Sequence, residues 1–469
     1  MIHPAMKSFL LIIAMAFSAL LSAAGQTARL TLIPPLSVTA SVPVEIRAGI
    51  VPEEAGEYDI TVSIDTEDDD GFLCSQKARL SEGEAYCLEH SLSVAGMAGK
   101  HRIIMSVKTP DGKVLRRTEE ITVLESGRRS PGTIDGAWMG LYHWSETEGK
   151  MWNDDIRKLT ARQWRMLVRD MHSLGMDIIV IQEVFRNQMY VGRHDVTTAT
   201  YEGRAFYPSE IYPGRMPVRT EDPLEAIFSE ADRLGMKVFP GIGLFAWFDF
   251  SEESLAWHKL VAGEIWERYG HHESFYGFYV SEESVGSLDN CEPDILARAL
   301  RKKQITGFFK EFDEFCESLA PGLPVMLATN SMGILQGADT YPALLEHLDI
   351  LCPFGFARMP EGDLTGKQAA DTLQSMCDKA GAHLWFDLEA FLFRPDMSLY
   401  PREIEGIMED LMLLDNFEKI LCYQYPGVFN NPRRTFIVGE RKTRTLFRQY
   451  EKFLKDRMMD GGKSELTAN

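Results

Sequence analysis

The chain shows two patterns of hydrophobic and polar positions, one after the other. In the first part, runs such as residues 44–48, 58–64 and 102–107 alternate apolar with polar positions, and turn residues separate them. Alternation with a period of two indicates half-buried β-strands, and several short strands at regular spacing are typical of a sandwich. The pattern therefore predicts a small all-β, immunoglobulin-like sandwich domain over residues 26–125.

After a polar, proline-bearing linker at residues 126–133, continuous apolar runs replace the alternation. Such runs predict buried strands, and segments of helical periodicity lie between them. The expected strands lie at residues 137–142, 177–184, 237–244, 275–283, 325–329, 350–354, 384–388 and 420–425.

The helices expected between these strands carry start and stop signals. Two of them begin with a capping-box pattern, at Thr160 with Gln163 and at Thr365 with Gln368. A third begins at Asp222, which precedes a proline at the first helical position. Glycine, the usual left-handed C-cap, follows three helices, at Gly175, Gly235 and Gly381.

About eight strand–helix units predict an α/β fold, a (β/α)8 TIM barrel at residues 134–460, followed by a disordered tail at 461–469. The alternative fold is an open doubly wound sheet. That fold is disfavoured because no glycine-rich phosphate loop follows the first strand.

The N-terminal residues 1–25 have the composition of a secretory signal peptide. Lys7 precedes an apolar run at residues 9–21, and small residues follow it. The run is short for a bilayer span, which disfavours the alternative of a membrane anchor. We therefore expect a secreted or periplasmic protein without membrane insertion after signal removal.

Composition and charge limit which partners and cofactors we expect for this protein. A net charge of -20 disfavours nucleic acid and anionic membranes, which require a basic surface. Cys74 and Cys87 can form a disulfide outside the barrel, and no cysteine–histidine cluster indicates a metal site. The acidic segment 65–71 departs from the EF-hand pattern, so we interpret it as a hairpin tip. No metal and no cofactor are expected.

Polar and aromatic side chains follow many of the expected barrel strands. In a (β/α)8 barrel, function lies at these C-terminal strand ends. Acids, amides and aromatic rings are the side chains that sugar recognition uses. The expected substrate-binding residues are His143, Trp144, Glu183, Trp247, Asn330, Asp387, Tyr423 and Gln424. Trp385 is either a further sugar platform or a core residue.

Strands four and seven end in carboxylates, at Glu282 and Glu283 and at Glu389. Two carboxyl groups hydrolyse a glycosidic bond when one protonates the leaving oxygen and the other attacks the anomeric carbon or activates water. Strand alternation places Glu282 and Glu283 on opposite sides, so one of them is expected to be structural. The alternative role for the acids is ion pairing with arginines such as Arg358 or Arg394.

This arrangement resembles the clan of retaining glycosidases with (β/α)8 barrels. The motifs at residues 277–283, 385–391 and 423–425 are also similar to those of a family of exported, uncharacterised barrel proteins described as candidate glycoside hydrolases. The resemblance implies that Glu283, or alternatively Glu282, is the acid/base and that Glu389 is the nucleophile.

The sequence thus predicts an exported glycoside hydrolase that acts on an oligosaccharide or polysaccharide, with a retaining mechanism. The alternative is a non-catalytic glycan-binding protein on the same scaffold. A carbohydrate esterase is disfavoured because no Gly-x-Ser-x-Gly elbow is present.

Overall fold

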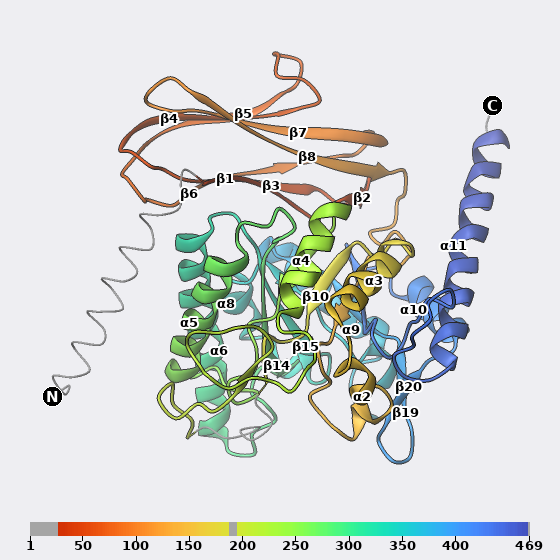
Figure 1. The fold of residues 1–469 in the computed structure, drawn as a ribbon. Coiled ribbons are helices and arrows are strands. Elements are labelled where there is room, and N and C mark those ends of the chain that lie inside the picture. Colours follow the sequence, from red (N-terminus) through yellow and green to blue (C-terminus); the bar gives the residue numbers. More distant parts are fainter. Residues whose placement is uncertain (1–26, 187–194, 468–469) are drawn as a thin grey trace, which may run out of the picture. The chain divides into compact units, whose positions relative to one another are not determined.

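The structure, a computed structural model, describes residues 27–186 and 195–467 (Figure 1). The predicted signal peptide at residues 1–25 lies outside the described residues. The chain divides into two compact units, one up to Glu125 together with Glu317–Leu323, and one of Ser126–Cys316 and Pro324 onward.

The first unit contains two β-sheets, as the alternating pattern predicts. A three-stranded antiparallel sheet has the order β1-β3-β6, with β1 (Thr27–Ile33), β3 (Val44–Val51) and β6 (Tyr86–Leu92). A five-stranded sheet has the order β2-β8-β7-β4-β5, with β2 (Ser37–Thr39), β8 (Val114–Leu124), β7 (Gly99–Lys108), β4 (Gly56–Ile64) and β5 (Phe72–Leu80). Alternate residues of β4, such as Tyr58, Ile60 and Val62, are buried in a core that both sheets share.

The disulfide that the sequence allows between Cys74 and Cys87 is not formed, since both cysteines are free. Cys74 lies on β5 opposite Val62, whereas Cys87 lies on β6 opposite Gly49. The two thiols therefore belong to strands of different sheets.

The acidic segment 65–71 joins β4 to β5 and closes with a hydrogen bond from the Ile64 amide to the Gly71 carbonyl, so it is a hairpin tip.

The second unit is a parallel α/β region. One sheet has the order β13-β10-β9-β21-β18 and the other has the order β14-β15-β16-β17, with parallel pairing throughout. The strands are β9 (Gly136–Met139), β10 (Ile178–Ile181), β13 (Lys237–Pro240), β14 (Phe278–Val285), β15 (Val325–Asn330), β16 (Ile350–Leu351), β17 (His383–Leu384), β18 (Phe386–Glu389) and β21 (Ile420–Tyr423).

Two junctions lie between these sheets. Isolated parallel bridges join Val238 to Phe275 and Gly241 to Tyr279, and Trp385 alone separates β17 from β18. The strand order is consistent with a glycosidase-like barrel, while the continuous ladders form two separate sheets. Figure 1 shows helices on the outside of these strands.

The helices of this unit are α2 (Asn153–Ile156), α3 (Ala161–His172), α4 (Pro223–Leu234), α5 (Glu252–Tyr269), α6 (Ile295–Leu319), α7 (Ile334–Gly337), α8 (Tyr341–Leu345), α9 (Gly366–Ala380), α10 (Ile404–Leu413) and α11 (Lys442–Thr467). Both capping boxes are confirmed, because Thr160 and Thr365 accept backbone hydrogen bonds while Gln163 and Gln368 bond back. Asp222 caps α4, and Gly235 and Gly381 are left-handed C-caps.

Several element ends differ from the expected ones. β14 continues past the two acids to Val285, with a register shift between Val280 and Ser284. α11 continues to Thr467, beyond residue 460, where a disordered tail was expected.

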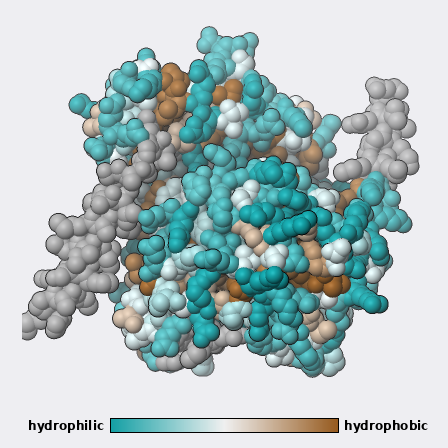
Figure 2. Space-filling view, in the orientation of Figure 1, coloured by the Kyte–Doolittle hydropathy of each residue, from teal (hydrophilic) through white to brown (hydrophobic). Residues whose placement is uncertain are grey.

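No described helix is long and apolar enough to cross a membrane. The surface in Figure 2 is largely hydrophilic, with smaller hydrophobic patches.

Candidate functional site

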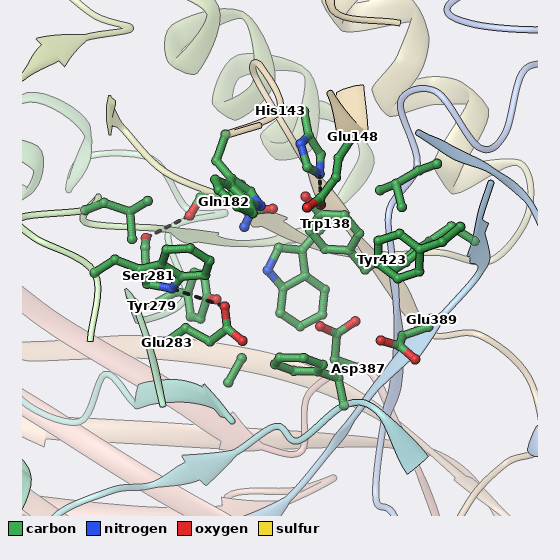
Figure 3. A pocket seen from close by; sticks show the side chains of 18 of the residues that line it. Trp138, His143, Glu148, Gln182, Tyr279, Ser281, Glu283, Asp387, Glu389 and Tyr423 are labelled. Atoms are coloured by element: carbon green, nitrogen blue, oxygen red, sulfur yellow. Dashed lines mark hydrogen bonds and ion pairs between the residues drawn. The ribbon is translucent and has the colours of Figure 1, made fainter. Parts of the chain in front are cut away.

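A cavity of about 210 Å³ lies in the second unit, at the carboxyl ends of the parallel strands. Its lining comes from nearly every strand or from the loop that follows it. Trp138 lines it from β9 and Tyr279 from β14, and their rings meet edge to face at 5.8 Å. Figure 3 shows the carboxyl groups of Glu148, Glu283 and Glu389 directed toward the space around the Trp138 indole.

Glu283 enters the cavity from β14, next to the register shift that reorients this end of the strand. Its Oε2 accepts a hydrogen bond from Trp247 Nε1 at 3.2 Å. Burial raises the pKa of Glu283 to about 7, and the negative charges of Glu148 and Glu389 act in the same direction. Glu283 is therefore partly protonated near neutral pH.

Glu282 is turned away from the cavity and is fully buried. Its Oε1 accepts hydrogen bonds from the backbone amides of Phe245, at 2.6 Å, and Ala246, at 3.1 Å. Burial raises the pKa of Glu282 to about 8, with a contribution from the charge of Asp249. Glu282 thus anchors the loop after β13, which carries Trp247.

Glu389, the last residue of β18, contacts Arg358 across the cavity. Arg358 Nε donates to Glu389 Oε1 at 2.7 Å, and Nη2 lies 2.7 Å from the same oxygen. Arg358 ends the short 3-10 helix η3 (Phe356–Arg358), which follows β16. Two nitrogens of Arg358 thus hold one oxygen of the Glu389 side chain.

Asp387 precedes Glu389 by two residues, so both side chains point to the same face of β18 and both line the cavity. Burial raises the pKa of Asp387 well above its usual range, and the charges of Glu389 and Glu283 add to the shift. Its buried Oδ1 has no hydrogen-bond partner among the described residues. Asp387 is accordingly held toward its protonated form.

Glu148 also brings a carboxyl group into the cavity, although the sequence analysis did not predict it because it does not lie at the end of a strand. It begins the 3-10 helix η1 (Glu148–Met151), within the loop that follows β9. Its Oε2 lies 3.6 Å from His143 Nε2. Burial lowers the pKa of His143 to about 3 and raises that of Glu148 to about 7, so the histidine is neutral. An acid in a loop directly after a barrel strand was the available signal.

Five of the expected substrate-binding residues line the cavity: His143, Trp144, Trp247, Asp387 and Tyr423. The ring centroids of Trp144 and Trp247 lie 4.5 Å apart, with the ring planes tilted by 56°. Gln182 and Arg358 also line the cavity, from the ends of β10 and from η3.

Three other expected residues lie outside the cavity lining. Glu183 is fully buried and pairs with Arg186 at 3.1 Å, and Arg186 also donates to the carbonyl oxygens of Tyr142 and His143. Asn330 Oδ1 accepts from the Met332 amide, and Gln424 is fully buried. Glu183 and Asn330 position backbone near the cavity.

Trp385 is a core residue rather than a sugar platform. Its side chain is fully buried and packs against Phe239, with the ring centroids 5.9 Å apart. The position of Trp385 between β17 and β18 directs it away from the cavity lining.

One group of described residues has the composition of a metal site, away from the cavity: Glu225, His271 and His272, with ligand atoms within 4.8 Å of one another. His272 Nδ1 lies 2.6 Å from Asp232 and Nε2 lies 3.1 Å from Glu225. Contacts with Asp232 and Glu225 therefore account for both ring nitrogens of this histidine without a metal.

The chain belongs to a protein family described as DUF4434, a domain of unknown function, whose model matches residues 134–435. A search of the curated proteins found no match. Solved structures with similar folds include a protein described as a putative alpha-L-fucosidase from Bacteroides thetaiotaomicron. Its identity is 16% and its TM-score is 0.50, over 69% of this chain and 93% of that chain.

Two further solved structures are glycoside hydrolases. A beta-glucuronidase from Bacteroides uniformis has 12% identity and a TM-score of 0.40, over 86% of this chain and 46% of that chain. A GH2 beta-galacturonidase from Eisenbergiella tayi, bound to galacturonate, has 12% identity and a TM-score of 0.39, over 87% of this chain and 69% of that chain. The chain thus spans about half the length of the glucuronidase. The likeness to the structure with a TM-score of 0.50 is a likeness of fold alone.

Proposed function

We propose that this protein is an exported glycoside hydrolase in which Glu283 and Glu389 form the catalytic carboxyl pair. The observation that carries the proposal is the difference between their surroundings within one cavity. Burial raises the pKa of Glu283 to about 7, whereas Glu389 contacts the guanidinium group of Arg358 at 2.7 Å. A carboxyl group with a raised pKa suits the role of the acid, which leaves Glu389 for the role of the nucleophile or base.

In the proposed reaction, the protonated Glu283 donates its proton to the glycosidic oxygen as the bond to the anomeric carbon breaks. The Glu389 carboxylate attacks the anomeric carbon, or activates a water molecule that does so. In the first case, the ionised Glu283 then takes a proton from the water that releases the sugar. Both routes consume one water. The first returns the proton to Glu283 directly, whereas in the second Glu389 keeps the proton taken from water until exchange with solvent restores both groups.

Other features of the described residues support a sugar substrate. Trp144 and Trp247 offer flat apolar surface for the CH face of a pyranose ring. Asp387 and Tyr423 add groups that can bond hydroxyls. The likeness of fold to a solved structure with a TM-score of 0.50 supports a closed (β/α)8 barrel over residues 134–460. The two β-sheets that share a core in the first unit support an immunoglobulin-like domain before it.

The test is hydrolysis of a panel of 4-nitrophenyl glycosides and of natural oligosaccharides by the wild type and by Glu283→Gln. Loss of the acid should reduce kcat on oligosaccharides by about 10²–10⁴-fold. The same variant should retain far more activity on 2,4-dinitrophenyl glycosides, because that leaving group needs no proton. Glu361→Gln, which removes an exposed carboxylate outside the cavity, is the matched control. An equal loss on both kinds of substrate would contradict the role of Glu283 as acid.

A non-catalytic glycan-binding site is the second candidate. It is favoured by the contact of Arg358 with Glu389, because that contact occupies an oxygen of the proposed nucleophile. Binding of oligosaccharides without hydrolysis of any panel member would support this alternative.

A further inference from the structure

The cavity contains more carboxyl groups than a pair of catalytic acids requires. Four carboxyl side chains line it: Glu148, Glu283, Asp387 and Glu389. Asp387 and the proposed catalytic pair come from the ends of strands, whereas Glu148 reaches the cavity from the separate helix η1. Glu148 is therefore the acid for which the proposed reaction gives no role.

The cations of the lining do not balance these acids. Among the described lining residues, the basic side chains are those of Arg358 and His143. Arg358 directs both Nε and Nη2 to Glu389, and burial keeps His143 neutral by lowering its pKa to about 3. Lys150, on the same short helix as Glu148, instead donates to Asp396 at 2.9 Å.

The carboxyl groups already influence one another across the cavity. The charges of Glu148 and Glu389 raise the pKa of Glu283, and those of Glu389 and Glu283 raise the pKa of Asp387. A further carboxylate brought by a ligand would meet the same repulsion in a partly desolvated space. Hydroxyl or ammonium groups would instead donate hydrogen bonds to the acids.

We infer that Glu148 is a substrate-binding residue that selects neutral or amino sugars and rejects uronic acids. Its carboxyl group accepts hydrogen bonds from hydroxyl or ammonium groups of the glycosyl unit. The inference rests on the proposed function for the site, and it adds the class of sugar.

The test is binding, measured by calorimetry with the folded protein at pH 6 and pH 8. The probes are the methyl glycosides of glucose, glucosamine and glucuronic acid and their three galacto counterparts. In at least one series, we expect the uronic acid to bind about tenfold or more weakly than the neutral sugar. The difference should grow from pH 6 to pH 8, because Glu148 and Glu283 ionise near pH 7.

Glu148→Gln separates this role from a structural one. The variant should narrow the ratio of neutral-sugar to uronic-acid affinity by about threefold or more, because it removes one repulsive charge. Asp154→Asn removes one charge from an exposed position six residues away and should leave the ratio unchanged. A fault in folding would weaken all probes together and leave their ratio intact.

Three results would overturn the inference: equal or tighter binding of a uronic acid, an unchanged ratio in Glu148→Gln, or no binding of any probe. Turnover assays keep it distinct from the proposed function. Hydrolysis with a preference for uronides would leave the proposed function standing and refute the inference. If the probes bind in the expected order but no glycoside is hydrolysed, the inference stands and the proposed function is refuted.

Discussion

Arg358 meets Glu389 with two nitrogens on one oxygen, since both Nε and Nη2 lie 2.7 Å from Glu389 Oε1. The guanidinium group of Arg358 is the principal positive charge in a cavity lined by four carboxyl groups. The same guanidinium group also lowers the pKa of Glu283, opposing the effect of burial. Arg358 therefore influences both members of the proposed catalytic pair.

Replacing Arg358 with Met should move the pH dependence of hydrolysis. Without the positive charge, the pKa of Glu283 rises above about 7, so the acid stays protonated to a higher pH. The alkaline limb of the kcat/KM profile should then shift to higher pH, while the maximal rate falls because Glu389 loses its partner. Arg394→Met, which alters an arginine that pairs with Glu440 outside the cavity, is the control. An unshifted alkaline limb would show that the arginine does not act on Glu283.

The hydrogen bond from Trp247 to Glu283 leads to a second prediction. The indole N–H of Trp247 lowers the pKa of Glu283 by its hydrogen bond. Trp247→Phe removes this donor, so the pKa of Glu283 should rise, while an aromatic ring stays next to Trp144. The alkaline limb should again move to higher pH, with a small change in KM. Trp144→Ala, which removes an aromatic ring of the cavity lining, should instead raise KM and leave the limb in place. Identical pH profiles for the two variants would contradict this division of roles.

Glu282 should affect stability in a pH-dependent way. Its pKa in the folded state is raised to about 8 from 4.5, so its favourable contribution is present at low pH and is lost as pH rises through about 8. Relative to Glu282→Gln, which does not titrate, the wild type should lose unfolding free energy between pH 5 and pH 9.

Urea denaturation at several pH values checks this prediction, with Glu361→Gln as the control. Relative to Glu282→Gln, Glu282→Ala should lose about 2–4 kcal/mol at every pH, because the buried amides of Phe245 and Ala246 then lack an acceptor. A pH-independent difference between the wild type and Glu282→Gln would argue against titration of Glu282.

The cysteines give a prediction that is independent of catalysis. Because Cys74 and Cys87 are free and lie on different sheets, thiol titration in denaturant without reductant should detect all 7 cysteines. Reductant should leave the unfolding midpoint unchanged. A count of five thiols would indicate a disulfide.

Local signals predicted much of the second unit. Three helices begin at a residue whose side chain accepts a hydrogen bond from a backbone amide of the first turn: Thr160, Asp222 and Thr365. Such caps join residues close in sequence, so the sequence alone is enough to predict them. The junctions of the two parallel sheets depend on contacts between distant segments. No local pattern could therefore have shown that the ladders break between β13 and β14.

The candidate site was predicted less completely than the helices. Glu283, Asp387 and Glu389 lie at strand ends, and alternation separated Glu283 from Glu282. Glu183 also lies near a strand end, but it follows the last residue of β10, and its pairing with Arg186 turns it away from the cavity. Glu148 could not be placed from periodicity, because it lies on a 3-10 helix within a loop.

The measurement that tests the central claim most directly is the turnover of Glu389→Gln on a glycoside that the wild type hydrolyses, with binding measured alongside. We expect kcat to fall on the order of 10³-fold or more, because an amide neither attacks the anomeric carbon nor activates water. The affinity for the same sugar should change little. Turnover within a few-fold of the wild type would contradict a catalytic role for Glu389, and with it the carboxyl pair.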